Sequence, residues 1–203
     1  MSISYQRTRE MTIDELLLEN RVVFLIGEIT PASAARVTMQ MLYLEHQKKG
    51  QDIHFYLNSP GGVVDDTLAI YDCMGFLTSQ ISTYCIGRAY SGAALLLTAG
   101  AKGKRYILPH AKVMIHQPFG GIGGQAEDIR IQAEQIIKSK NQLIKIIANH
   151  TGQTLDQVRK DSERDKYFSA EEAKAYGLVD EVIVPSQISH AQNAAAALPP
   201  EKR

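Results

Sequence analysis

The chain has little cysteine, no tryptophan and no excess of either charge. Its 203 residues include two cysteines, Cys73 and Cys85, and its 22 basic residues balance 22 acidic ones, for a formal net charge of zero. The two cysteines form no zinc-type or Cys-x-x-Cys pair, so we expect reduced thiols in a reducing compartment. Zero net charge offers no electrostatic attraction to nucleic acid or to an anionic membrane surface. The composition therefore predicts neither as a partner.

Long hydrophobic runs are also missing. Residues 1–7 lack the apolar core of a signal peptide, and the apolar run 16–26 is interrupted by Glu19 and Arg21. The most apolar stretch, 93–99, is far too short to span a bilayer. We therefore expect a cytoplasmic protein, with an organelle stroma as the alternative compartment.

Strand and helix patterns alternate along the chain. β-branched and apolar runs predict strands at 22–26, 53–57, 81–86, 105–108, 112–116 and 182–184. Periodic apolar segments predict helices at 13–18, 30–47, 63–76, 93–97, 125–150, 155–160 and 170–175. Such alternation favours an α/β domain with largely parallel strands.

Three parts of the chain differ in composition. Residues 1–20 are expected to form an N-terminal arm followed by a short helix, and residues 21–184 the main domain. Residues 185–203 are rich in alanine, glutamine and proline, which predicts a disordered tail.

The long helix predicted over 125–150 has an apolar stripe and two isoleucines outside it. The stripe consists of Ile129, Ala133, Ile136, Ile137, Leu143, Ile144 and Ile147. A single stripe is typical of a helix that covers its own core. Because Ile131 and Ile146 fall outside it, we expect these two residues to lie on a surface between subunits.

The most informative motif places Ser91 where an apolar strand meets an apolar helix. Ala89 and Ala93 stand two residues before and after it. Small residues at these positions allow the sharp turn that exposes the hydroxyl of a nucleophile elbow. Two interpretations are open: Ser91 is a nucleophile, or it merely caps the N-terminus of the helix.

A nucleophilic serine needs a base and a carboxylate that orients the base. Among the six histidines, His116 ends the apolar strand 113–115, at a sheet edge where sites tend to lie; a structural histidine is the alternative. The acid stays open among Asp161, Glu163 and Asp165, which lie together in a segment that also has the composition of a solvated loop.

Two glycine-rich motifs admit different functions. Gly61-Gly62 can supply a backbone N–H to a substrate carbonyl, or can form only a turn. The segment 121–126 fits a dinucleotide-binding pattern, but residues 117–119 separate it from the strand and no ribose-binding acid follows at the right distance. There is no phosphate-binding loop and no cluster of metal ligands, so the sequence predicts no cofactor and no metal.

Several motifs together resemble the proteolytic subunits of the Clp protease, over about residues 22–184. These motifs are Asn58-Ser59-Pro60-Gly61-Gly62, Ala99 to Arg105, Met114-Ile115-His116-Gln117-Pro118, Gly124-Gln125-Ala126, His150-Thr151-Gly152-Gln153, and Glu163 to Asp165 followed by Ser169 to Ala173. The resemblance implies a crotonase-like α/β spiral of βαβ units. It also implies a protruding handle at about 119–150, made of a strand and a long helix.

The resemblance implies a serine endopeptidase. By position in the motifs, Ser91 is the nucleophile, His116 the general base and Asp165 the orienting carboxylate. The backbone N–H groups of Gly62 and Gly92 are the oxyanion donors.

The resemblance also implies partners. The subunits are expected to form two stacked seven-membered rings, with Arg164 and Gln125 at ring contacts. An AAA+ Clp ATPase is expected to deliver unfolded polypeptide substrates. The cleft of this chain on which the ATPase docks is expected to include Tyr56, Phe76, Tyr84, Ile86, Tyr106 and Ile183. His54 stands there where the family often has an aromatic residue.

The chain departs from the family pattern in two places. It reads Tyr90-Ser91-Gly92 where the family usually has Ala-Ser-Met, so Gly92 lacks a side chain that would shape the specificity pocket, and Tyr90 is expected to add bulk beside the nucleophile. The N-terminal segments 8–11 and 13–18 also differ. These departures leave open an alternative: a weakly active or regulatory subunit of mixed rings that contain paralogous subunits.

Two rival functions come from other classes. A non-catalytic ring scaffold would need no intact Ser91, His116 and Asp165. An acyl-CoA enzyme of the crotonase type would use paired N–H donors without this triad.

Overall fold

The computed structural model describes residues 11–118, 121 and 123–184. Residues 1–10 of the expected N-terminal arm, and the expected tail at 185–203, lie outside the described residues. The strands are β1 (Val22–Ile26), β2 (Ile53–Ser59), β3 (Ile81–Tyr90), β4 (Arg105–Ile107), β5 (Lys112–Ile115), β6 (Lys166–Phe168) and β7 (Glu181–Val182). The helices are α1 (Ile13–Glu19), α2 (Pro31–Gln47), α3 (Val64–Phe76), α4 (Gly92–Thr98), α5 (Ala126–Thr151), α6 (Leu155–Asp161) and α7 (Ala170–Tyr176).

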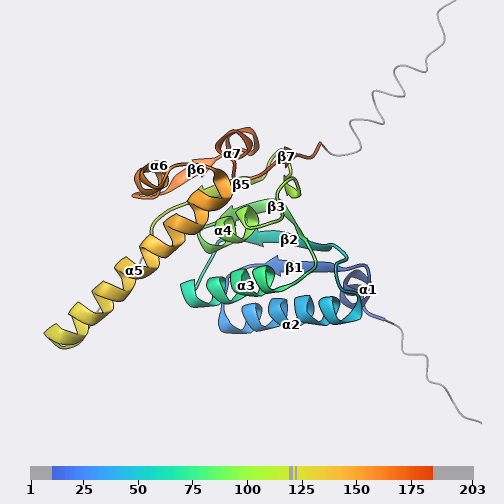
Figure 1. Cartoon of the computed structure of the whole chain (residues 1–203), viewed down its shortest axis with the longest axis horizontal. Helices are drawn as coiled ribbons and strands as arrows, with labels where there is room; N and C mark the ends of the chain where they lie inside the picture. Colours follow the sequence, from blue (N-terminus) through green and yellow to red (C-terminus); the bar gives the residue numbers. More distant parts are fainter. Residues whose placement is uncertain (1–10, 119–120, 122, 185–203) are drawn as a thin grey trace, which may run out of the picture.

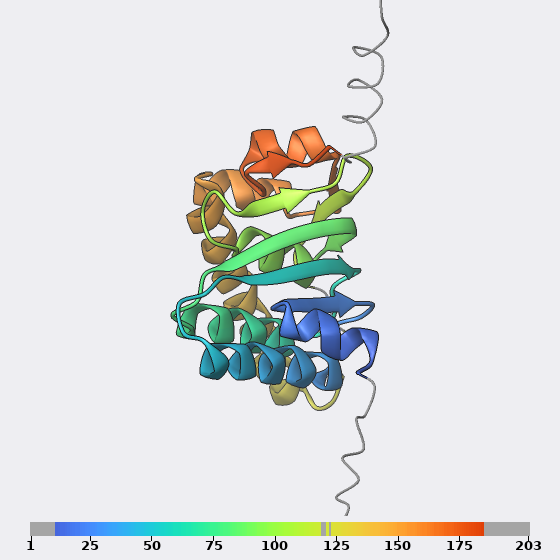
Figure 2. The ribbon, with the colours of Figure 1, turned by 90° about the vertical axis from the view of Figure 1, so that its right-hand side faces the viewer.

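The strands form one mostly parallel sheet, as predicted. Five of them follow the order β1-β2-β3-β4-β7, and β5 pairs with β3 beyond the point where β4 ends. Strand β6 pairs with β5 and is the antiparallel member. Helices α2 and α3 lie beside each other on one side of β1 and β2, and α4 lies under β3 (Figures 1 and 2).

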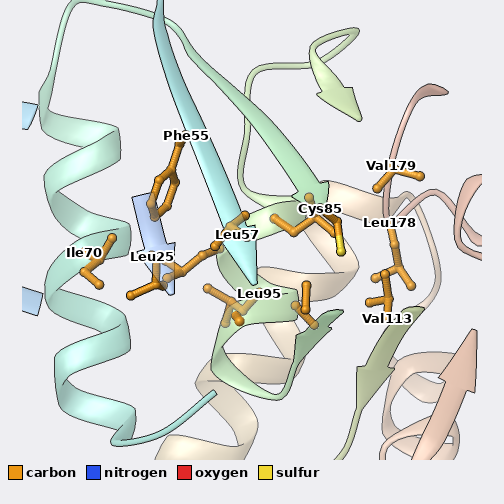
Figure 3. Packing of buried hydrophobic residues seen from close by; sticks show 14 of the residues in the cluster. Leu25, Phe55, Leu57, Ile70, Cys85, Leu95, Val113, Leu178 and Val179 are labelled. Atoms are coloured by element: carbon orange, nitrogen blue, oxygen red, sulfur yellow. The ribbon is translucent and has the colours of Figure 1, made fainter. Parts of the chain in front are cut away.

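The core lies between the sheet and these helices. Along β2, Ile53, Phe55 and Leu57 are fully buried, whereas His54 and Tyr56 are half-buried. This alternation of period two is typical of a strand with one face on the core. Figure 3 shows the buried side chains of β2 packing with residues of the neighbouring strands and of helices α3 and α4, including Leu25, Ile70, Cys85 and Leu95.

Helix α5 contacts the body through its C-terminal half and projects away from it at the other end (Figure 1). Ile144, Ile146 and Ile147 are buried. The expectation for Ile146 is therefore wrong, because it is only 9% exposed and belongs to its own subunit's core. Ile131 is 46% exposed, so it lies outside the core, and its place on a surface between subunits stays a prediction.

The projecting half of α5 also exposes residues of the predicted stripe. Ile129 and Ile137 are exposed together with Ile131. A helix of 26 residues is about 39 Å long at 1.5 Å per residue, so it extends past the body on which it rests. One apolar stripe therefore covers the core at one end of the helix and faces away from it at the other.

One strand is missing from the prediction. The sequence left a solvated loop open for the charged segment that includes Asp165, whereas Lys166–Phe168, at the end of that segment, forms β6. Of the strand expected in the handle, residues 119, 120 and 122 lie outside the described residues, so that strand stays a prediction.

Candidate active site

Ser91 occupies a strained turn between β3 and α4. Its backbone dihedrals are φ 54° and ψ −122°, and Arg21 is the other non-glycine residue with positive φ in the described part of the chain. Such a conformation costs on the order of 1–3 kcal/mol and tends to occur at functional sites. The side chain makes no capping hydrogen bond to α4, so the interpretation as a simple helix cap is wrong. The turn instead has the form of a nucleophile elbow.

Gly61 allows the segment that follows β2 to pass close to this turn. A Cβ atom at Gly61 would lie 2.6 Å from the carbonyl oxygen of Tyr90 and 2.7 Å from the Cβ of Ser91. Its φ of 89° also favours glycine. Because both sterics and backbone conformation demand glycine here, Gly61 is required by the fold of the site.

The sheet register brings a histidine and a carboxylate to the serine. In the β5–β6 pair Ile115 lies opposite Lys166, so the next residues, His116 and Asp165, also face each other. The backbone N–H of Ser91 donates to the carbonyl of Met114 at 2.8 Å, which places the elbow beside the end of β5. Strand pairing thus assembles three residues that are distant in the sequence.

These three side chains form a continuous chain of hydrogen bonds. Nε2 of His116 lies 2.8 Å from Oγ of Ser91, and Nδ1 lies 3.1 Å from Oδ1 of Asp165. The His116 side chain is largely buried, whereas the Asp165 side chain is 55% exposed. With Nδ1 protonated and donating to Asp165, Nε2 is free to accept the serine proton.

The two other candidate acids do not reach His116. Asp161 accepts hydrogen bonds from Lys166, Gln157 and Tyr176. Burial opposes ionisation of Asp161, but these hydrogen bonds outweigh it and hold its pKa below the usual value. Glu163 contributes its backbone carbonyl, which accepts from the side chain of Gln117. Of the three acids, Asp165 is the one whose side chain contacts His116.

The other described histidines lie elsewhere. His54 contacts the hydroxyl of Tyr84 at 3.0 Å, and His150 contacts that of Tyr71 at 3.2 Å. His46 and His110 are exposed, and His190 lies outside the described residues.

Two backbone N–H groups near Ser91 are available to a substrate oxygen. Gly62 forms a parallel bridge with Ile29 in which Val63 donates to Ile29 and Ile29 donates to Gly61, so the N–H of Gly62 takes no part. The N–H of Gly92 is the first of α4 and has no partner within the helix. Neither group donates to another described residue.

A small apolar cavity adjoins the serine. Its wall includes Ser91, His116, Gly62 and Gly92 together with Val64, Thr67, Leu95, Ile115, Pro118, Leu143 and Ile147. Tyr90 is absent from this wall. Its ring meets the ring of Tyr167 edge-on at 5.5 Å and lies 5.8 Å from the guanidinium of Arg88. The expectation that Tyr90 crowds the nucleophile is therefore wrong, because alternation along β3 directs its side chain to the other face of the sheet.

Sequence reasoning missed two residues that support this site. Gln117 follows His116, donates to the carbonyl of Glu163 at 3.1 Å, and accepts a hydrogen bond from Lys140 of α5 at 2.7 Å. Its backbone N–H donates to the carbonyl of Ser162 at 2.6 Å. Gln117 could have been found from the sequence, because it directly follows His116. Nothing in the local sequence indicated Lys140.

A row of stacked aromatic rings crosses the opposite face of the sheet. The ring centroids of Tyr56 and Tyr84 are 4.5 Å apart, and those of Tyr84 and Tyr106 are 4.9 Å apart. Phe24, which sequence reasoning missed, extends the row by stacking on Tyr56 at 5.3 Å. The rings align because the residues are direct partners in the parallel register of β1 to β4.

The remaining predicted contact residues are dispersed. Ile86 and Ile183 are half-buried, whereas Phe76 is exposed at the end of α3. Arg164 and Gln125 are also exposed; the first lies between α6 and β6, the second at the start of α5.

The described residues contain no group of three or more His, Cys, Asp or Glu side chains able to hold a metal ion. None of the helices in this part of the chain is long and apolar enough to cross a membrane.

A serine in a strained elbow, hydrogen-bonded to a histidine that faces a carboxylate, is the arrangement found in serine-type hydrolases. Comparison with known proteins narrows this class. The family model described as Clp protease matches residues 5–186. The chain is also 50% identical over 186 residues to "ATP-dependent Clp protease proteolytic subunit 1" of Rhodopirellula baltica, covering 92% of this chain and 82% of that protein. The chain belongs to the Clp protease family, and it is a peptidase subunit of the serine type.

Proposed function

We propose that Ser91, His116 and Asp165 are the catalytic triad of an endopeptidase that cleaves unfolded polypeptides. The single observation that carries this proposal is the 2.8 Å contact between Oγ of Ser91 and Nε2 of His116. It places a general base within proton-transfer distance of a hydroxyl already exposed by the turn. The contact from His116 to Asp165 supports the same assignment.

The geometry leads to a two-stage hydrolysis. Oγ of Ser91 attacks the scissile carbonyl carbon while Nε2 of His116 takes the serine proton, and the carbonyl oxygen becomes an oxyanion that accepts from the N–H groups of Gly62 and Gly92. The C–N bond then breaks and His116 passes the proton to the leaving amine. Water, deprotonated by His116, attacks the acyl-enzyme and releases Ser91 with its proton restored. Asp165 stabilises the imidazolium formed in each stage.

We propose a partner AAA+ ATPase as the source of unfolded substrate. The chain has no phosphate-binding loop, and a folded protein stable by about 5–15 kcal/mol must be opened before it can enter a closed chamber. The half-buried row of Phe24, Tyr56, Tyr84 and Tyr106, with Ile86, Ile183 and Phe76 as further members, is the surface proposed to receive that ATPase. Aromatic residues are enriched in such interfaces.

We propose that the chain assembles into two stacked seven-membered rings. The exposed Ile129, Ile131 and Ile137 on the projecting half of α5 support self-association, since such an apolar surface is typical of an interaction site. Arg164 and Gln125 are proposed to contribute contacts between rings. The division into an arm at 1–20, a peptidase domain at 21–184 and a tail at 185–203 is part of this proposal.

A covalent probe tests the triad. We expect a fluorophosphonate to label Ser91, located by peptide mapping, and we expect His116→Gln to abolish both labelling and peptide cleavage. The matched control is His110→Gln, because His110 is exposed and does not line the cavity beside Ser91. Labelling in His116→Gln at the rate of the control would contradict the assignment.

A native mass measurement tests the assembly. Two seven-membered rings have the mass of fourteen chains of 22.5 kDa. Ser91→Ala is expected to preserve that mass while removing activity, because the hydroxyl takes part in chemistry and not in packing. If the mass of fourteen chains appears only when paralogous subunits are present, the rings are mixed and not homomeric.

A further inference from the structure

Gly92 has no room for a side chain, although its backbone would accept one. Its φ is not positive, so no special conformation demands glycine. A Cβ atom at this position would lie 2.4 Å from Oγ1 of Thr67, 3.1 Å from its Cγ2 and 3.2 Å from its Cβ. These three nearest atoms all belong to one side chain, that of Thr67 on α3.

Thr67 is held firmly in this place. It is 1% exposed, and its hydroxyl donates to the carbonyl of Val63 at 2.9 Å. β-branching restricts its χ1 rotamers within a helix. Turning this side chain aside would cost the hydrogen bond to Val63, so a larger residue at position 92 competes with Thr67 for one volume.

That shared volume borders the cavity beside Ser91. Thr67 and Gly92 both line it, and the remaining side chains of the wall are apolar apart from Ser91 and His116. A side chain bound here would lie next to the oxyanion donor Gly92 and the attacking hydroxyl. Position 92 contributes no side chain to this wall, and Thr67 of α3 fills the space beside it.

We propose that Thr67 is a specificity-determining residue for peptide cleavage, because it supplies from α3 the bulk that position 92 lacks. Its methyl and hydroxyl groups limit the space for the side chain on the N-terminal side of the scissile bond. The cavity volume is about 30 Å³, which favours a small aliphatic side chain over an aromatic ring. This inference rests on the proposed function of Ser91.

Two variants of Thr67 separate the effect of its side-chain volume from the effect of its hydrogen bond. Thr67→Ala removes two heavy atoms, whereas Thr67→Val keeps the volume and loses only the bond to Val63. Using fluorogenic peptides with Ala, Leu or Phe before the scissile bond, we expect Thr67→Ala to raise kcat/KM for Phe relative to Ala about tenfold, since one methylene in such a pocket changes discrimination by about 10-fold or more. Thr67→Val is expected to retain the wild-type ratio. Equal ratios in wild type, Thr67→Ala and Thr67→Val would overturn the inference.

Moving the bulk from position 67 to position 92 tests the shared volume, with the melting temperature as a measurement besides activity. Gly92→Met is expected to lower the melting temperature and to slow cleavage, and Thr67→Gly in the same chain is expected to restore both in large part. Additive effects of the two substitutions on melting temperature would also overturn the inference.

The outcomes separate this inference from the proposed function. If wild-type protein neither reacts with the fluorophosphonate at Ser91 nor cleaves any peptide, the proposed function fails and the specificity role fails with it. If wild type is active and the Thr67 variants keep its selectivity, only the specificity role fails.

Discussion

The ammonium group of Lys140 on the projecting helix α5 donates a 2.7 Å hydrogen bond to the side-chain oxygen of Gln117, the residue after His116. Gln117 in turn is bonded to the carbonyls of Ser162 and Glu163, in the segment that leads to Asp165. One glutamine therefore joins the helix proposed for ring contact to both segments that carry the proposed base and acid. This link makes the geometry of the site dependent on the position of α5.

We expect Lys140→Met to lower kcat several-fold with little change in KM, because misplacing a catalytic group by a fraction of an ångström weakens orientation more than binding. Lys138→Met, an exposed lysine of the same helix, is the control. Steady-state peptide cleavage at equal assembly state measures the effect. Identical kcat values for the two variants would show that the link has no influence on catalysis.

We expect Asp165→Asn to reduce kcat by at least about 100-fold while fluorophosphonate labelling becomes correspondingly slow. The amide no longer stabilises the imidazolium, and it favours the wrong tautomer of His116. Glu163→Gln is the matched control, since its side chain is exposed and only its backbone bonds to Gln117. A large loss in Glu163→Gln with little loss in Asp165→Asn would exchange the roles of the two acids.

Arg105 is expected to be a major source of stability. Its guanidinium is buried, pairs with Asp180 at 2.5 Å and donates to the carbonyls of His150 and Gly177 at 2.9 Å. Removing one partner of a buried ion pair costs roughly 3–5 kcal/mol. Arg105→Met should therefore lower the free energy of unfolding in denaturant by about that amount, whereas the exposed Arg159→Met should change it little. Similar midpoints of denaturant unfolding for the two variants would show that Arg105 is not a major source of stability.

Glu45 is expected to make the free energy of unfolding depend on pH in the acid range. Hydrogen bonds from Ser79 first, and then from Thr78, lower the pKa of Glu45 from 4.5 to about 2. A carboxyl whose pKa is lowered by folding contributes stability that is fully present above the unfolded value of about 4.5 and is lost as the pH falls towards 2. We expect Glu45→Gln to be less stable at neutral pH, with a flatter dependence of unfolding free energy on pH between 4.5 and 2.

The exposed Glu171→Gln on α7 is the control for this measurement. Its pH profile is expected to follow that of the wild type. If Glu45→Gln and wild type lose stability in parallel over this acid range, the bonds from Ser79 and Thr78 do not act through ionised Glu45.

The elbow around Ser91 could be predicted from the sequence because its signal is local. Small residues at 89 and 93, a β-branched strand before the serine and helix formers after it all lie within about 15 residues. The same holds for the start of α2, where Thr30 and Ser33 form a capping box and Pro31 occupies the first turn. Such elements depend on backbone preferences that neighbouring residues decide.

Local pattern alone could not choose the partners of Ser91. His116 was one of six histidines and Asp165 one of three acids, and only the resemblance to the family singled them out. The tertiary structure brings both to Ser91, because β3 pairs with β5 and β5 with β6. Strand β6 escaped prediction because its three residues follow a run of charges that has the composition of a loop. Once it pairs with β5 in antiparallel register, His116 and Asp165 face each other.

By itself, the sequence determined where the helices and all strands except β6 lie, because hydrophobic periodicity and turn chemistry act over a few residues. It also carried the motifs that mark the family. Only the tertiary structure decided that Ile146 is buried, that Tyr90 faces away from the nucleophile and that Thr67 occupies the space beside Gly92. Each of these depends on which surfaces meet across the sheet and its helices, and close packing settles that only when the whole chain is folded.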